Sequence, residues 1–241
     1  MYNPKPGWEH QVMDGLEKLQ EALPHHRISL GLVDDGSDQK VLPEAIAYCQ
    51  KKWSDFSIHS YAKNQGKGFA IRYAVKEGPE ADITVYTDYD LPYSHQSMVD
   101  LVETLERSDV AFGIRDEDYY AQVPSTRTKI SKGLKWLNRQ LTGLPFDDTQ
   151  AGLKGFNAKG KTLFLKTKIK RFLFDLEFVA AAFHHHEIQL KTVKVSLRKD
   201  IEFSRFSPKT LLIELSSYFR LLLTINGRRF ARNFSRKKSN K

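Results

Sequence analysis

The strongest constraint on the fold is a regular alternation of short apolar segments with amphipathic ones between residues 8 and 114. The short segments have the β-prone composition of strands, and the longer ones have the apolar spacing of helices. We predict strands at 28–33, 56–60, 82–87 and 109–114, and helices at 8–23, 43–52, 69–76 and 94–106. This order predicts an α/β fold with a mostly parallel sheet flanked by helices.

The alternation loosens after residue 114. We predict helices at 125–141, 158–166 and 174–183, a loop at 143–154 and a strand at 188–195. In segment 208–225, leucine and phenylalanine recur at the i, i+4 spacing of an amphipathic helix. Since no internal repeat or linker is visible, we predict one domain over residues 1–207, followed by an amphipathic helix and a basic tail over 208–241.

The formal net charge of +9 is concentrated at one end of the chain. Segment 226–241 holds seven Lys and Arg residues and no Asp or Glu, so +9 minus seven leaves +2 for the rest. We therefore expect no nucleic-acid partner and favour an anionic surface as the partner of the tail. The one cysteine, Cys49, excludes an internal disulfide and fits a reducing cytosol.

Two carboxylates stand one residue apart after the predicted strand 82–87. If extended geometry continues to the strand tip, Asp88 and Asp90 share one face. Two carboxylates this close repel each other unless a cation lies between them, and their oxygens suit Mg²⁺ or Mn²⁺. The same residues also fit an acidic turn, so the rest of the chain has to decide.

Two further polar segments are predicted at the same edge of the sheet. Asp34 and Asp35 follow the strand 28–33, and the loop 64–68 precedes the helix 69–76. Because ligands of such sheets bind at the carboxyl ends of the strands, these segments and Asp88 converge on one rim. The convergence indicates a binding site.

Taken together, these motifs resemble the family-two glycosyltransferases with the A-type nucleotide-sugar fold, most closely the branch that moves a sugar onto dolichyl or undecaprenyl phosphate. Each motif is short, but the ordered set is specific. The set comprises Tyr2-Asn3-Pro4, Asp34-Asp35-Gly36-Ser37, Asn64-Gln65-Gly66-Lys67-Gly68, Asp88-Tyr89-Asp90, Gly113-Ile114-Arg115, Arg127 with Ser131, the run from Asp148 to Lys154, and Phe174-Asp175-Leu176-Glu177. The resemblance implies a metal-dependent inverting glycosyltransferase.

The resemblance also implies roles for the donor-side residues. Contacts with the nucleotide of a UDP- or GDP-sugar would come from Tyr2, Asn3, Asp34, Asp35, Ser37, Asn64, Gly66, Lys67 and Gly68. A carboxylate accepts strong charge-assisted bonds, glycine lets the backbone approach a nucleotide, and a lysine offsets phosphate charge. By itself, an Asp-Gly-Ser turn with a helix cap, or a loop that opens a helix, would explain the same residues.

Asp88 and Asp90 would hold Mg²⁺ or Mn²⁺ on the donor diphosphate. In the polyprenyl-phosphate branch, a glutamine that binds the metal often occupies the position of Pro92. Proline has no such ligand, so we expect only the two carboxylates as protein ligands of the metal. The acceptor phosphate would be gripped by Arg115, Arg127 and Ser131. A phosphate acceptor is already anionic and needs no general base. An acceptor hydroxyl would need one, and Asp148 and Asp175 are the candidates.

The chain departs from the family in two respects. The usual first strand before the Tyr-Asn turn is missing, so either the true start lies upstream or the sheet lacks that strand. No membrane-spanning segment follows the catalytic domain, and 208–241 either lies on an anionic bilayer or consists of a core-packing helix with a disordered tail. We expect a cytoplasmic protein, peripheral on the inner membrane face. Two alternatives are transfer to a saccharide hydroxyl in polysaccharide or glycolipid synthesis, and a non-catalytic nucleotide-sugar or membrane-binding module.

Overall fold

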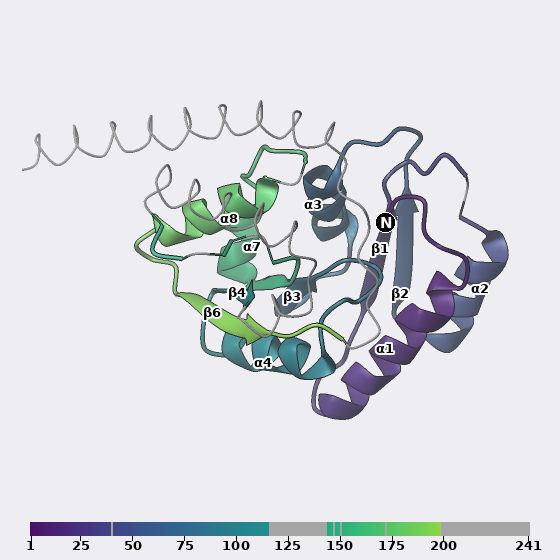
Figure 1. The fold of residues 1–241 in the computed structure, drawn as a ribbon, viewed down its shortest axis with the longest axis horizontal. Helices are drawn as coiled ribbons and strands as arrows, with labels where there is room; N and C mark the ends of the chain where they lie inside the picture. The colour runs from purple at the N-terminus through teal and green to yellow at the C-terminus, as the bar shows by residue number, and fades with distance from the viewer. Residues whose placement is uncertain (40, 116–143, 147, 150, 172, 199–241) are drawn as a thin grey trace, which may run out of the picture.

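A computed structural model describes residues 1–39, 41–115, 144–146, 148–149, 151–171 and 173–198 of the chain (Figure 1). The described helices are α1 (Trp8–Ala22), α2 (Pro43–Lys52), α3 (Lys67–Glu77), α4 (His95–Leu105), α7 (Ala158–Phe164) and α8 (Phe174–Phe183). The described strands are β1 (Leu30–Asp34), β2 (Phe56–Ser60), β3 (Ile83–Tyr86), β4 (Val110–Arg115), β5 (Lys154–Asn157) and β6 (Leu190–Val195).

Within these residues, every predicted helix and strand is present, and its ends differ from the prediction by at most two residues. The α2, β2 and α8 elements coincide with the predicted segments 43–52, 56–60 and 174–183. The predicted helices 125–141 and 208–225 and the basic tail lie outside the described residues. The predicted α/β class, with helices flanking the sheet, is confirmed.

The strands form two hydrogen-bonded sheets. In the first, β1 pairs with β2 in parallel, and Leu30 lies opposite Phe56. The second has the order β3-β5-β4-β6, with β4 and β6 parallel and β5 antiparallel to both of its neighbours. We did not predict β5, because its first residue ends the predicted loop 143–154, and the three residues between that loop and the predicted helix 158–166 are too few to indicate a strand. The antiparallel pairing that it introduces is therefore an addition to the mostly parallel sheet we expected.

Gly155 explains why so short a segment can occupy the middle of the second sheet. A Cβ atom at this position would lie 2.5 Å from the Leu105 Cδ1 atom and 2.9 Å from the Thr84 carbonyl oxygen. A glycine in a strand often marks such a close approach of neighbouring groups. The β5 strand is thus selected by its neighbours and not by its own β propensity.

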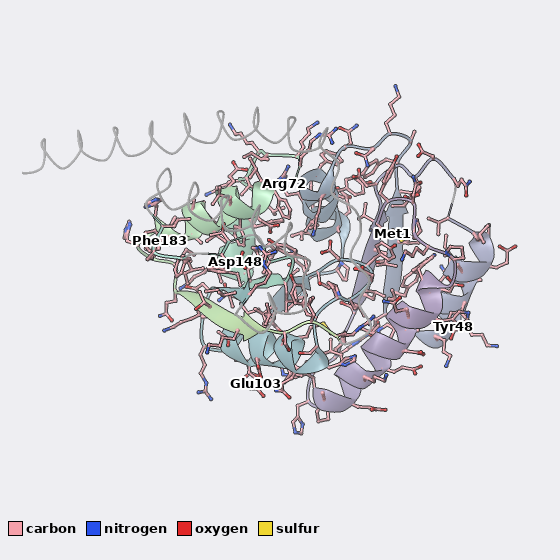
Figure 2. All side chains as sticks on the ribbon, viewed as in Figure 1. Met1, Tyr48, Arg72, Glu103, Asp148 and Phe183 are labelled. Atoms are coloured by element: carbon pink, nitrogen blue, oxygen red, sulfur yellow. The ribbon has the colours of Figure 1, made fainter. Side chains whose placement is uncertain are left out.

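The N-terminal residue lies beside β1 (Figure 2). Its amino group donates to the Val33 carbonyl oxygen, and its own carbonyl oxygen accepts from the Asp35 backbone N–H at 2.8 Å. Apart from this one residue, no described segment extends the edge of β1 toward β3, and no ladder joins the two sheets.

Helices cover both faces of the second sheet (Figure 1). On one face, Leu101 and Leu105 of α4 pack against Ala111. On the other, Phe164 of α7 and Phe178 of α8 pack with fully buried Phe156. Each such side chain contributes about 1.5–3 kcal/mol by leaving water. These two cores hold the strand ends, and hence the rim, in fixed positions.

The described helices contain none that is both long and apolar enough to cross a membrane.

The single cysteine tests the packing between α1 and α2. Cys49 is fully buried, and burial together with the nearby charge of Glu9 raises the pKa of its thiol to about 11. A rise of this size lowers the thiolate fraction at pH 8 by roughly 100-fold. We predict that 5,5′-dithiobis(2-nitrobenzoate) labels the native protein far more slowly than the urea-unfolded protein. Equal labelling rates would contradict this packing.

Candidate functional site

Three of the predicted rim segments are joined by direct contacts. The carboxylate of Asp35, just after β1, accepts from the backbone of the loop before α3. The first residue of α3, Lys67, donates to Asp88 after β3. Because the carboxyl ends of β1 and β3 and the start of α3 are tied together in this way, the predicted convergence on one rim is confirmed for these segments.

The Asp88-Tyr89-Asp90 motif lies in a tight turn. The β3 strand ends at Tyr86, the Leu91 N–H donates to the Asp88 carbonyl at 3.0 Å, and Leu91 has a φ of 44°. The condition that extended geometry continues to Asp90 is therefore not met, because Leu91 and Pro92 force the chain to turn. Asp90 is half-buried, and burial together with the charge of Asp88 raises the pKa of its carboxyl.

An ammonium group is bound to the Asp88 carboxylate. The Lys67 Nζ atom lies 2.5 Å from the Asp88 Oδ1 atom, and the two side chains are 19% and 44% exposed. Burial alone would lower the pKa of Lys67, but the charges of Asp88, Asp175 and Asp90 outweigh it, so the pKa is raised. Lys67 is therefore held as a cation at this site.

The residues present fit a divalent cation. Asp88 already binds a positive charge, and the raised pKa of Asp90 reflects burial and the repulsion that a cation between the two carboxylates would relieve. Asp88 and Asp90 would hold Mg²⁺ or Mn²⁺, which would neutralise diphosphate charge. In the described part of the chain, no group of three or more His, Cys, Asp or Glu side chains is arranged to hold a metal. Two protein ligands therefore remain the expectation.

Asp35 braces the loop before α3. Its Oδ1 atom accepts from the Tyr61 hydroxyl and from the Gln65 N–H, both at 2.7 Å, and Oδ2 accepts from the Gly66 N–H at 2.9 Å. The Asp35 carboxyl group is buried. Burial of Tyr61 raises the pKa of its hydroxyl, and the hydrogen bond to Asp35 raises it further. Through these bonds, Asp35 positions the loop before α3.

The other donor-side residues form a second hydrogen-bonded group. Buried Asp34 accepts from the Ser37 hydroxyl at 2.5 Å and from the Ser37 N–H at 3.1 Å, so Ser37 closes a turn. Asp38, which we did not predict, accepts from the Tyr2 hydroxyl and from the Asn3 amide, both at 2.9 Å. These contacts hold the N-terminal segment against the loop after β1.

The glycines of the loop approach the protein itself. Gly66 has a φ of 98°, and a Cβ there would lie 2.6 Å from the Lys170 carbonyl oxygen. At Gly68 a Cβ would lie 2.5 Å from the Phe174 Cβ. Both glycines thus make room for the segment before α8 and for its first residue, and their predicted approach to a nucleotide stays a prediction. Asn64 is exposed beside them.

A buried ion pair lies beneath the rim. The Lys154 Nζ atom lies 2.9 Å from the Asp175 Oδ1 atom and also donates to the Ala151 carbonyl oxygen. The Tyr86 hydroxyl donates to the same Asp175 oxygen at 2.9 Å. Burial lowers the pKa of Lys154 despite the charge of Asp175, whereas burial and that charge raise the pKa of Tyr86. Asp175, predicted as a candidate base, is thus 5% exposed and ion-paired.

Asp148, the other candidate base, is gripped by Arg115. The Arg115 Nε and terminal nitrogen atoms donate to the two Asp148 oxygens at 2.5 and 2.8 Å, and the Arg115 N–H adds a third bond at 3.1 Å. The Asp148 side chain is 1% exposed and lies in the interior (Figure 2). Two nitrogens of the guanidinium that we assigned to the acceptor phosphate are therefore bound to Asp148.

Arg127 and Ser131, predicted for the acceptor, lie outside the described residues. Sequence reasoning missed the functional positions of Lys154, Tyr86 and Tyr61, since nothing in their local spacing marks them as partners of Asp175 or Asp35. The available signal for Lys154 was its place at the end of the motif from Asp148 to Lys154, directly before a glycine.

The Lys154–Asp175 pair gives a stability prediction. Lys154→Met should cost about 3–5 kcal/mol of unfolding free energy, because it leaves Asp175 buried without its cation. Replacing both residues, as Lys154→Met/Asp175→Leu, should recover part of that loss. Urea unfolding measures both. Lys161→Met, which breaks the pair with the exposed carboxylate of Glu80, is the matched control and should cost less than about 1 kcal/mol. Equal losses of unfolding free energy in Lys154→Met and Lys161→Met would contradict the assignment of Lys154 and Asp175 as a buried ion pair.

Comparison with known proteins gives a consistent picture. No family model matches the chain. Over 209 residues the chain is 29% identical to the dolichyl-phosphate beta-glucosyltransferase of Homo sapiens, and over 210 residues it is 28% identical to that of Mus musculus. Each match covers 82% of this chain and 64% of the relative, so the chain spans about two thirds of the length of these relatives.

Solved structures match over nearly the whole chain. A glucosyl-3-phosphoglycerate synthase from Mycobacterium tuberculosis, in complex with Mn²⁺, UDP-glucose and phosphoglyceric acid, has a TM-score of 0.62 at 16% identity, covering 94% of this chain and 77% of that one. A mannosyl-3-phosphoglycerate synthase from Rubrobacter xylanophilus has a TM-score of 0.62 at 16% identity, covering 95% and 73%. The chain therefore has the A-type nucleotide-sugar glycosyltransferase fold and is similar in sequence to the dolichyl-phosphate glucosyltransferases, as its motifs predicted.

Proposed function

We propose that this chain catalyses the metal-dependent, inverting transfer of a sugar from a UDP- or GDP-sugar to a polyprenyl phosphate. The observation that carries the proposal is the state of the two candidate bases. Asp148 and Asp175 are both buried and both ion-paired. Groups held in this way are poorly placed to take a proton from an acceptor hydroxyl.

A phosphate acceptor removes the need for that proton transfer. A phosphate monoester is anionic at neutral pH, so its oxygen can attack the sugar carbon directly while the nucleoside diphosphate departs. The protein then has to position two anions and offset their charge. Arg115 is oriented by Asp148 near the end of β4, and we assign it, with Arg127 and Ser131, to the acceptor phosphate.

The donor side supplies the complementary charge. Asp88 and Asp90 would hold the cation, which stabilises the departing diphosphate. Lys67 at the start of α3 adds a second positive charge, and the backbone N–H groups of a helix N-terminus favour phosphate. Tyr2, Asn3, Asp34, Asp35, Ser37, Asn64, Gly66 and Gly68 would shape the nucleotide pocket around it.

The names of the relatives support the stereochemistry. Both are beta-glucosyltransferases. UDP-glucose carries its glucose in the α configuration, so a single attack from the opposite face gives a β product. This is inversion at the sugar carbon, and it needs no covalent sugar–enzyme intermediate.

The reaction is tested with purified chain, Mg²⁺ or Mn²⁺, radiolabelled UDP- or GDP-sugars and undecaprenyl or dolichyl phosphate. Asp88→Asn and Asp90→Asn should each lower the transfer rate by about 100-fold or more, since the cation supplies several kcal/mol of transition-state stabilisation. Asp82→Asn, at an exposed carboxylate just before β3, is the matched control and should leave the rate unchanged.

Two outcomes would contradict the proposal. Transfer to saccharide hydroxyls but never to polyprenyl phosphate would favour the alternative role in polysaccharide or glycolipid synthesis. Donor binding that persists without metal in the Asp88→Asn/Asp90→Asn variant, together with no transfer to any acceptor, would favour a non-catalytic nucleotide-sugar-binding module.

A lipid acceptor requires access to a membrane, and we assign that role to residues 208–241 on the cytoplasmic side. Each Lys or Arg near an anionic surface contributes about 1 kcal/mol, and segment 226–241 carries seven. We predict sedimentation of the protein with phosphatidylglycerol vesicles but not with phosphatidylcholine vesicles, and release by 0.5 M salt. Arg228→Glu/Arg229→Glu/Arg232→Glu should abolish this binding. Unchanged binding by that variant would exclude the tail as the membrane contact.

A further inference from the structure

The carboxylate of Asp88 is a ligand for two cations, the Lys67 ammonium and the expected metal, and the two compete for it. The Asp88 carboxylate, which we assign to the metal, already binds the Lys67 ammonium at 2.5 Å from its Oδ1 atom. An ammonium and a divalent cation both need the lone pairs of that carboxylate, and their like charges repel each other. A metal that binds Asp88 must therefore displace the ammonium or bind beside it at a cost.

The other oxygen of Asp88 faces Gly152 on one side. A Cβ atom on Gly152 would lie 2.6 Å from Asp88 Oδ2 and 3.4 Å from Lys67 Nζ, so Gly152 lies close to the ion pair. Gly152 is itself held in place, because its N–H donates to the buried Tyr93 hydroxyl at 2.6 Å. A cation therefore has little room at Oδ2 on the side of Gly152, and on its other sides it binds the carboxylate that Lys67 already neutralises.

The local charges favour an exchange of partners. Asp88, Asp90 and Asp175 contribute three negative charges, and Lys67, Lys154 and Arg198 contribute three positive ones. These charges balance without a metal, so a dication leaves an excess of positive charge. A diphosphate has the opposite charge and can accept the displaced ammonium.

We propose that Lys67 is an internal counter-ion that competes with the metal for Asp88 and moves to the donor diphosphate when metal and donor bind together. The proposal rests on the proposed function and deepens it. Lysine suits such an exchange, because its ammonium is a point charge on a flexible four-carbon stem. The location of Lys67 at the first position of α3 puts the group beside the helix N-terminus, where phosphate is favoured.

The exchange makes metal and donor binding cooperative. Without donor, the metal has to break the Lys67–Asp88 pair and leaves the ammonium without its hydrogen-bonded carboxylate. With donor, the diphosphate stabilises that ammonium, so the metal binds more tightly. By linkage, the metal must raise the affinity for the donor by the same factor. Removing the ammonium should therefore strengthen metal binding alone and weaken the coupling.

The test measures Mn²⁺ binding by electron paramagnetic resonance, and UDP binding by calorimetry, on the full chain. Lys67→Met should tighten Mn²⁺ binding in the absence of nucleotide by about tenfold, and should reduce by about tenfold the factor by which Mn²⁺ tightens UDP binding. Lys67→Arg, which keeps the charge, should retain the weaker Mn²⁺ binding. Lys161→Met, which breaks an ion pair away from the site, should match the unmodified protein in both measurements.

Mn²⁺ affinity that is unchanged or weakened in Lys67→Met would overturn the proposal, as would tightening in Lys67→Arg equal to that in Lys67→Met. These results are separable from the proposed function. If the unmodified protein transfers sugar with metal but Lys67→Met binds Mn²⁺ no more tightly, only the exchange is wrong. If Lys67→Met tightens Mn²⁺ binding but no sugar transfer occurs, the exchange stands and the proposed reaction is wrong.

Discussion

The buried contact between Lys154 and Asp175 joins three parts of the fold that are distant in sequence. Lys154 begins β5, Asp175 lies in the first turn of α8, and the Tyr86 hydroxyl at the end of β3 donates to the same carboxylate. Both charges are out of water, so neither can lose its partner without a cost of several kcal/mol. The pair therefore fixes the segment before β5 against the strand that leads to Asp88, and the geometry of the rim depends on it.

Above this pair, the rim is organised by charge compensation. Three acidic groups of the rim have a defined partner: Asp35 binds backbone N–H groups, Asp88 binds Lys67, and Asp148 binds Arg115. Carboxylates that are fully satisfied by the protein position loops. The pair Asp88 and Asp90 differs, because Asp90 is half-buried, its carboxyl pKa is raised, and its neighbour is partly exposed. A cation has most to contribute at this point of the rim.

Residue types were easier to predict than the contacts that they make. The loop glycines were correctly placed before a helix, yet Gly66 and Gly68 make room for Lys170 and Phe174, which lie about a hundred residues further along the chain. Asp148 and Asp175 were selected as acids near the acceptor, yet their ion pairs change the chemistry available to them. Such pairings depend on how α7, α8 and β5 pack, and no local spacing encodes that packing.

The sequence by itself determined the alternation of helices and strands, the positions of the strand ends and the family that the ordered motifs resemble. These features are local, because apolar periodicity and turn residues act over a few positions. Only the tertiary structure decided that β5 enters the sheet between β3 and β4, that Asp88 lies in a turn, and that Lys67 neutralises it. Those outcomes depend on close packing and on charges brought together from distant segments, where burial makes each unpaired group costly.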